Sequence, residues 1–496
     1  MYYGRKKGII ITIIVIILLL VLAIGGILLY LYTDLFKSNE TLFLKYISQT
    51  TQSMKYETNE QLEDVLKNQE QNPYEVKGTL NFNYEGEQNT NAEILKQLQL
   101  IVNSNVNKPE EKSYSKATLV YQDQNLFNIE YANSNNIYAL KSDEIVTAFV
   151  GIRNENLKVL AQKLGISDTT KIPDSIEFVD YEELLEISEE EKKHISDTYL
   201  PVIIESIPKE KYTKQSNIPI TKEGVEYNTN SYRLDLSSEE ISNVLVKVLQ
   251  TLQQDSITLN LITTKAKLLN LSEEYTQINK LTQVIQEKID DINDSRKLPE
   301  EGLSIIVYEE KGKTILTEFI IKNNAKITIY ANNENEKNNI YAMLENLSSD
   351  EDFKMVEMQI TNTKTTAQSN TEILINKDNN IGIELYITNT GLASDGNVSS
   401  NCEIVYNQDN NKYVVNYEQE LNFVENENNI VNLDNTNCAI LNDYPTDQLS
   451  MLIQLITAQT TNVLYQKIQQ MGIIFANNQE QQIQINQENI NAEVQM

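Results

Sequence analysis

A run of 24 residues without a charge, Ile9 to Tyr32, constrains this chain more than any other feature. As a helix rising about 1.5 Å per residue, the run would be roughly 36 Å long, enough to cross a hydrocarbon core of about 30 Å. Arg5, Lys6 and Lys7 precede it, and basic residues next to such a helix stay on the cytoplasmic side. The sequence therefore predicts one transmembrane helix over 9–32, with residues 1–8 as a cytoplasmic stub.

The far end of the run is consistent with this topology. Tyr30 and Tyr32 lie where interfacial aromatic rings prefer to sit, and the rest of the chain is then expected outside. A cleaved signal peptide is the alternative, because Ala23-Ile24-Gly25 fits a small-residue cleavage site. The apolar run continues past that site, which favours an uncleaved anchor. We therefore expect a single-pass cell-membrane protein whose first partner is the lipid bilayer.

Charge and composition exclude several classes of protein. The formal net charge is −30, so the phosphate backbone of a nucleic acid would be repelled and no nucleic-acid partner is expected. Two Cys and one His are too few for a Cys/His zinc framework within one chain. No metal site and no cofactor are predicted.

The residues after the anchor change from helical to strand periodicity. Leu42, Phe43, Tyr46 and Ile47 share one helical stripe, so residues 33–72 are expected to form a helical stalk that lifts the body off the membrane. From Val76 to Tyr84, apolar and polar residues alternate as in a half-buried strand. Further strands and helices follow, and we assign residues 73–292 to a first sheet-plus-helix lobe.

A polar segment with Pro299 and Gly302, residues 293–302, is interpreted as a linker between two lobes. The second lobe, residues 303–475, is expected to contain further strands and to end in a helix that begins at Pro445. Residues 476–496 are rich in Gln and Asn and are predicted to be a disordered polar tail. The predicted fold class is thus α+β: one N-terminal transmembrane helix, a helical stalk, and two tandem antiparallel-sheet-plus-helix lobes.

An internal repeat is consistent with two lobes. Tyr131-Ala132-Asn133 is followed by an Asn-Asn-Ile-Tyr-Ala sequence, and Tyr330-Ala331-Asn332 is followed by the same five residues. Helix openings at Ser238 and Thr446 also match in their apolar spacing. Duplication and compositional bias both explain these matches, and the sequence leaves the choice between them open.

No catalytic residue can be assigned from the motifs. Two serine-x-x-lysine sequences, at Ser113 and Ser206, lack the partner Lys-Thr-Gly strand of penicillin-recognising enzymes. Gly312-Lys313-Thr314 resembles the end of a phosphate-binding loop but lacks the leading glycine and is better explained as a turn. His194 is not part of a recognisable catalytic motif and is interpreted as a surface histidine.

The two cysteines form the one candidate covalent feature. Cys402 and Cys438 each fall on a predicted strand of the second lobe, and outside the cell they could form a disulfide between neighbouring strands. Two buried thiols are the alternative, because cysteine is a common core residue.

The order of a basic stub, an anchor, and then Thr33-Asp34-Leu35-Phe36-Lys37-Ser38 resembles uncharacterised single-pass envelope proteins of low-GC Gram-positive bacteria. That resemblance implies an extracytoplasmic location and no assigned activity.

Three functions remain open. The first is a membrane-anchored, extracytoplasmic, noncatalytic protein that binds an envelope partner, a peptide or a lipid through the concave face of a sheet; another envelope or membrane protein would then be a partner. The second is an envelope hydrolase that uses two carboxylates with displaced pKa values. The third is a structural spacer or assembly subunit.

Overall fold

A computed structural model gives the structure of the protein. It describes residues 38–54, 60–87, 89–169, 172–176, 187–269, 271–293, 302–334, 336–348, 354–378, 381–392, 397–408, 410–424 and 430–471. The predicted tail, 476–496, lies outside these residues.

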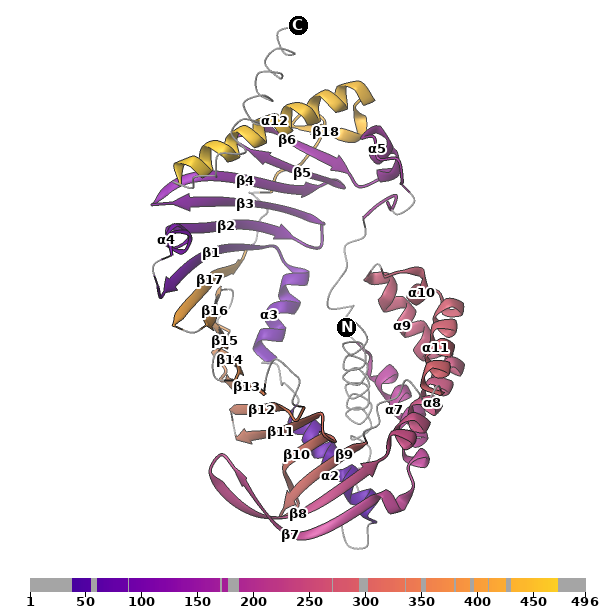
Figure 1. Ribbon diagram of the computed structural model, residues 1–496. Helices are drawn as coiled ribbons and strands as arrows, with labels where there is room; N and C mark the ends of the chain where they lie inside the picture. The colour runs from indigo at the N-terminus through magenta and orange to yellow at the C-terminus, as the bar shows by residue number, and fades with distance from the viewer. Residues whose placement is uncertain are drawn as a thin grey trace.

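The described residues form one sheet of 18 strands (Figure 1). The pairings place the strands in the order β7-β8-β9-β10-β11-β12-β13-β14-β15-β16-β17-β1-β2-β3-β4-β5-β6-β18. The β6–β18 pair is parallel and the other pairs are antiparallel. The bounds of the first eight strands are β1 Tyr74–Glu85, β2 Leu98–Asn107, β3 Lys112–Tyr121, β4 Gln124–Ser134, β5 Ile137–Ser142, β6 Val146–Arg153, β7 Tyr212–Lys222 and β8 Val225–Leu236. The others are β9 Leu303–Glu310, β10 Lys313–Ile321, β11 Ala325–Glu334, β12 Lys337–Asn346, β13 Met355–Lys364, β14 Gln368–Lys377, β15 Ile381–Thr390, β16 Asn397–Gln408, β17 Asn411–Phe423 and β18 Cys438–Ile440.

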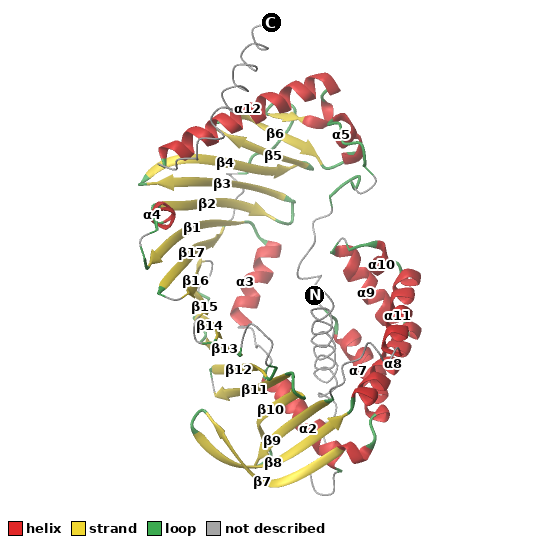
Figure 2. Ribbon diagram, viewed as in Figure 1, coloured by secondary structure: helices red, strands yellow, loops and turns green. Residues whose placement is uncertain are grey.

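The helices lie before, between and after the groups of strands (Figure 2). Those of at least six residues are α2 Asn39–Ser53, α3 Glu60–Gln71, α4 Thr90–Leu95, α5 Leu157–Lys163, α7 Glu189–Ser206, α8 Ser238–Gln254, α9 Ser256–Leu268, α11 Ile278–Asn293 and α12 Thr446–Gln470. A short helix, α10 Glu273–Thr276, joins α9 to α11. A capping box begins α8: the Ser237 side chain accepts from the Glu240 backbone, and the Glu240 side chain accepts from the Ser237 backbone.

The sheet is continuous, so the prediction of two tandem lobes is wrong. Strand β8 pairs with β9 across the predicted linker, with Leu236 opposite Leu303. Strand β1 pairs with β17 along its whole length, from Tyr74 opposite Phe423 to Glu85 opposite Lys412. Backbone hydrogen bonds therefore join the first predicted lobe to the second at both places, and the strands share one sheet instead of two.

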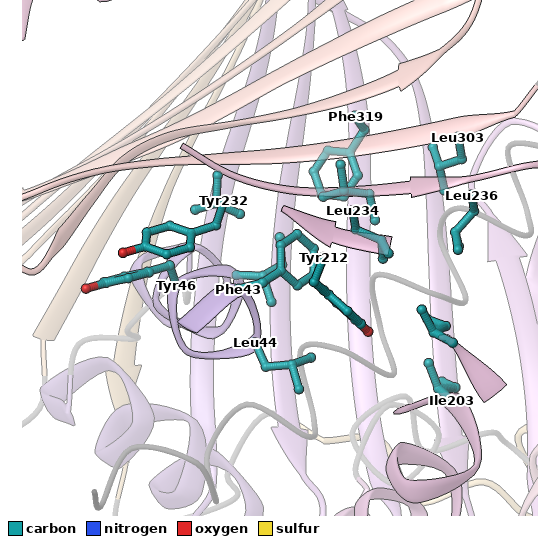
Figure 3. Close-up of a cluster of buried hydrophobic side chains, with 14 of the residues drawn as sticks. Phe43, Leu44, Tyr46, Ile203, Tyr212, Tyr232, Leu234, Leu236, Leu303 and Phe319 are labelled. Carbon is teal, nitrogen blue, oxygen red and sulfur yellow. The ribbon is translucent and has the colours of Figure 1, made fainter. Parts of the chain in front are cut away.

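Helix α2 is part of the core, so the predicted stalk is also wrong. Phe43 is 1% exposed, and it packs with its neighbours on the helix against Tyr212, Tyr232, Leu234 and Phe319 (Figure 3). The rings of Tyr46 and Tyr232 lie 5.1 Å apart. The apolar stripe of this helix was visible in the sequence, but its partner is the sheet and the helix is buried rather than projecting.

The far end of the sheet has its own core. Leu449 of α12 is fully buried with Leu157 and Leu160 of α5, and Val150 and Ile152 of β6 pack against them. A third cluster holds the helical layer together, with Leu281, Ile285 and Ile289 of α11 packed on Leu259 of α9, as expected from their helical spacing. Figure 1 shows this layer, α8 to α11, standing apart from the strands at the middle of the sheet.

The predicted transmembrane helix, 9–32, and its flanks Arg5, Lys6, Lys7, Tyr30 and Tyr32 lie outside the described residues. Within the part of the chain that the structure describes, no helix is both long and apolar enough to cross a bilayer. The longest described helix, α12, has 25 residues but carries amide and hydroxyl side chains along its length. This finding contradicts three predictions. They are the transmembrane, single-pass protein, the cell-membrane localisation and the bilayer as a partner.

Candidate functional site

The two faces of the sheet differ in chemistry. Side chains alternate along a strand, so Leu80, Phe82 and Tyr84 of β1 lie on one face and Lys77 and Thr79 on the other. We call the first the inner face, because α2 packs on it, and the second the outer face. Cross-strand register assigns side chains on the other strands to one face or the other.

One row of cross-strand partners follows the inner face through eleven strands. We call it the tyrosine row; from β1 to β8 it consists of Tyr84, Tyr413, Tyr406, Ile383, Ile375, Met358, Ala342, Ile329, Thr317, Val307 and Tyr232. At the β8 end, the row is covered by α2, and Ile329 is 6% exposed. At β15, Ile383 of the same row is 41% exposed. The row therefore leaves the core without changing its apolar character.

A second inner-face row repeats this change in exposure. We call it the isoleucine row; it consists of Phe82, Val415, Ile404, Leu385, Ile373, Ile360, Ile340 and Ala331. Ile340 is buried, whereas Ile404 on β16 is 44% exposed. Apolar side chains thus extend across the middle of the sheet beyond the helices that cover its ends.

Five exposed large apolar side chains lie on this inner face and define what we call the open apolar patch. They are Leu80, Ile129, Leu140, Ile383 and Ile404, on β1, β4, β5, β15 and β16. Single exposed apolar residues are ordinary on a protein surface, but a group on one face of one sheet indicates an interaction surface. The open apolar patch is therefore the main candidate site.

The backbone under the patch offers no hydrogen bonds to a ligand. Strands β1, β15 and β16 each have a paired strand on both sides, so their N–H and C=O groups are engaged in the ladder. Gly78 leaves room on this face for the Tyr417 ring, since a Cβ at Gly78 would lie 2.5 Å from the Tyr417 hydroxyl. Attraction at the patch comes from burial of apolar surface.

Tyrosines occupy one margin of the patch. The Tyr84 and Tyr413 rings lie 5.0 Å apart, and Tyr413 is 6.0 Å from Tyr406. The Tyr84 hydroxyl donates to the Asn411 Oδ1 at 2.7 Å, and the Tyr406 hydroxyl donates to the Gln408 Oε1 at 3.0 Å. This margin places polar groups beside the apolar rows.

Two buried carboxylates with lowered pKa values, Glu130 and Asp255, lie away from the patch. Glu130 on the outer face is almost fully buried between Lys116 and Lys141, each 3.2 Å from a carboxylate oxygen. Burial by itself would raise the pKa of Glu130, but hydrogen bonds from both lysines and from Tyr114 hold that pKa below its usual value. The cluster is a satisfied structural ion pair.

Asp255 is the second such group, and it lies beside His194, which the sequence analysis interpreted as a surface histidine. The His194 Nε2 lies 2.9 Å from the Asp255 Oδ1, and the Tyr199 hydroxyl donates to Oδ2 at 3.0 Å. Burial opposes ionisation of Asp255, but hydrogen bonds from Thr258, His194 and Tyr199 outweigh it and lower its pKa to about 2. His194 therefore helps to hold α7 against the start of α9, a role that spacing along the sequence could not indicate.

The predicted cysteine pair is not joined. Both thiols are free; Cys402 lies on β16 and Cys438 is buried on β18 at the edge of the sheet. Burial raises the pKa of both thiols. Among the described residues there is also no group of three or more His, Cys, Asp or Glu side chains placed to hold a metal ion.

The two copies of the Asn-Asn-Ile-Tyr-Ala sequence both form hairpins, β4–β5 and β11–β12. Their registers differ: Ala132 lies opposite Ala139 in the first, whereas Tyr330 lies opposite Tyr341 in the second.

A family model described as "Family of unknown function (DUF6583)" matches residues 2–484. The chain belongs to this family. The match confirms the resemblance to uncharacterised proteins but does not extend it to the envelope proteins of low-GC Gram-positive bacteria. No curated protein matches the chain.

Solved structures similar to the chain include a structure described as "Asymmetric conductivity of engineered proteins" and a mutant of Rh. blastica porin. Each is 8% identical, covers 71% of this chain and 98% of that chain, and has a TM-score of 0.20. The CymD monoaromatic hydrocarbon channel is 7% identical, with 79% and 94% coverage and a TM-score of 0.16. Scores this low carry no argument about fold or function.

Proposed function

We propose that this protein is a noncatalytic binding protein that holds the acyl chain of a lipid on the inner face of its sheet. The observation that carries the proposal is the change of exposure along the two inner-face rows. Ile329 and Ile340 are sealed in the core, and Ile383 and Ile404, in the same rows, are open to a ligand. A ligand that covered the open apolar patch would remove this apolar surface from water.

An acyl chain fits the patch better than a peptide does. A peptide brings its own N–H and C=O groups, which must find partners when they are buried, and peptides that bind sheets find them at an exposed edge. The strands under the patch are paired on both sides, so no such partners exist there. A hydrocarbon chain needs none.

The rows are also long enough for a lipid chain. The isoleucine row crosses eight neighbouring strands about 4.8 Å apart, so it is roughly 34 Å long. Two acyl chains end to end span a hydrocarbon core of about 30 Å, so one chain needs about half of the row. The Tyr84 and Tyr406 hydroxyls at the margin donate to Asn411 and Gln408, and their oxygens keep lone pairs that can accept a hydrogen bond from a polar head group.

The open patch also separates this proposal from a structural spacer. A spacer would have its inner face filled by its own helices, but Leu80, Ile383 and Ile404 are exposed between the helices at the two ends. The hydrolase hypothesis requires carboxylates with displaced pKa values facing a cleft. Glu130 and Asp255, whose pKa values are lowered, instead hold lysines and a helix N-terminus.

Binding of cis-parinaric acid, an 18-carbon fluorescent fatty acid, to the full chain tests the proposal. We expect a saturable rise in fluorescence, and the double variant Ile383→Gln/Ile404→Gln should weaken binding about tenfold, because about half of each side chain is available for burial. Glutamine is neutral, so repulsion of the fatty acid does not contribute.

The matched control is Ile257→Gln, which changes an isoleucine on α9 that is also about half exposed. It should bind as tightly as the unmodified chain. Absence of saturable binding, or equal binding by the double variant, would contradict the proposal.

A further inference from the structure

The outer face of the same strands carries a hollow of about 480 Å³. Five strands contribute to it: β15, β16, β17, β1 and β2. A volume of this size falls within the range of roughly 300–1,000 Å³ that is usual for small-ligand sites. We call it the polar hollow.

Two cross-strand rows form the surface of the polar hollow. The first is Thr390, Ser399, Glu420, Lys77 and Asn103, in register from β15 to β2. The second, one pleat further along the strands, is Thr388, Asn401, Glu418, Thr79 and Ile101. Nine of these ten side chains are polar, so the hollow differs in chemistry from the open apolar patch.

Most of these polar groups have no protein partner. Among the described residues, the side chains of Lys77, Asn103, Ser399, Asn401 and Glu420 make no hydrogen bond or ion pair. Lys77 and Glu420 lie directly opposite each other on β1 and β17 and still form no ion pair. The hollow therefore presents donors and acceptors that are free for a ligand.

The mixture of these groups selects the chemistry of the ligand. Glu418 and Glu420 only accept hydrogen bonds when ionised, Lys77 only donates, and the amide and hydroxyl side chains do both. A hydroxyl group both donates and accepts from one oxygen, so a ligand with several hydroxyls can satisfy all three kinds. Two carboxylates, in a chain of net charge −30, oppose an anion, and Lys77 opposes a cation.

We propose that the polar hollow binds a short neutral oligosaccharide through hydrogen bonds to Lys77, Asn103, Asn401 and Glu420. Ile101 supplies one apolar wall for the carbon side of a sugar ring. This site lies on the opposite face from the open apolar patch, so the proposal does not depend on acyl-chain binding.

Saturation-transfer difference NMR on the full chain tests the site with maltotriose, cellotriose and chitotriose as probes. We expect transfer to at least one trisaccharide and a loss of at least fivefold in Lys77→Ala and in Asn401→Ala. Both side chains are exposed, so the fold should survive, which a thermal melt checks. The matched control is Gln359→Ala, which removes an exposed outer-face amide on β13, outside the hollow, and should leave transfer unchanged.

Competition distinguishes a neutral ligand from a charged one. Inositol hexakisphosphate and spermine should not displace the bound trisaccharide. Displacement by either, absence of transfer to all three sugars, or transfer that survives both substitutions would overturn the proposal.

Discussion

The β8 end and the middle of the inner face share one row of side chains but differ in what covers them. At the β8 end, α2 packs Phe43 and Tyr46 over Tyr232 and Ile329. At β15 and β16 the same apolar pattern continues, and Ile383 and Ile404 are exposed. The strands are patterned alike in both regions, so the helix decides which part becomes core and which part stays available for binding.

This difference teaches that strand patterning and burial are separate properties here. Alternation of apolar residues fixes which face a side chain lies on, and a covering helix then fixes its burial. Four experiments test the comparison, in order of decreasing expected effect.

Phe43→Ala should produce the largest loss. Phe43 is the most buried large side chain that α2 packs on the sheet, and its truncation leaves a cavity between α2 and the β8 end of the sheet. We expect the free energy of unfolding to fall by about 3–5 kcal/mol. Urea denaturation measures the free energy of unfolding. A loss below 1 kcal/mol would mean that packing of α2 does not stabilise the β8 end of the sheet.

The pair Ile329→Ala and Ile383→Ala isolates the effect of the covering helix, because both residues belong to the tyrosine row. Ile329 is buried, so its truncation should lower the free energy of unfolding by about 2–4 kcal/mol. The same change at Ile383 should cost less than about 1 kcal/mol, because water already reaches that side chain. Equal losses in the two variants would break the comparison.

Asp255→Asn tests the hydrogen bonds that fix α7 to the start of α9. Helix α7 matters to the comparison because it contributes Ile203 to the core under α2. The pKa of Asp255 is lowered from 3.8 to about 2, so its ionised form stabilises the fold. That stability is complete above pH 3.8 and is lost as the pH falls through about 2. We expect the variant to be about 2 kcal/mol less stable at pH 7.

The pH dependence supplies the control for that experiment. The gap between Asp255→Asn and the unmodified chain should narrow as the pH falls from 4 to 2, because the Asp255 carboxylate is progressively protonated over this range. A gap that is constant between pH 7 and pH 2 would show that the carboxylate charge is not responsible.

Thr317→Val should have the smallest effect of the substitutions at buried positions. The Thr317 and Thr50 hydroxyls are buried and lie 2.6 Å apart, and their hydrogen bond is one of several that link α2 to β10. Replacing the hydroxyl by a methyl group should cost about 1 kcal/mol. Thr317→Ser keeps the hydroxyl and serves as the control in thermal unfolding. If Thr317→Val is as stable as the unmodified chain, this hydrogen bond does not contribute to the packing of α2 on the sheet.

Local features of the fold could be predicted from the sequence. The alternation from Val76 to Tyr84 predicted strand β1 and its apolar face, and the helix opening at Ser238 predicted the start of α8. Both predictions depend on residues close together in the chain, and periodicity and capping residues can be recognised over such short distances. The helical stripe of α2 was visible for the same reason.

Long-range pairing could not be predicted in this way. Nothing in the spacing of β8 or β9 indicates that they pair across four intervening helices, so the boundary at 293–302 was taken to separate two sheets. The polar hollow was equally hidden, because it exists only through the register of five strands.

The pairing of β1 with β17 has a consequence for synthesis of the protein. Tyr74 leaves the ribosome long before its partner Phe423, so the free side of β1 has no native neighbour while most of the chain is made. An unpaired strand edge invites association with other chains. A chain that ends before residue 411 should therefore be prone to aggregate, and completion of β17 is the step that protects the nascent protein.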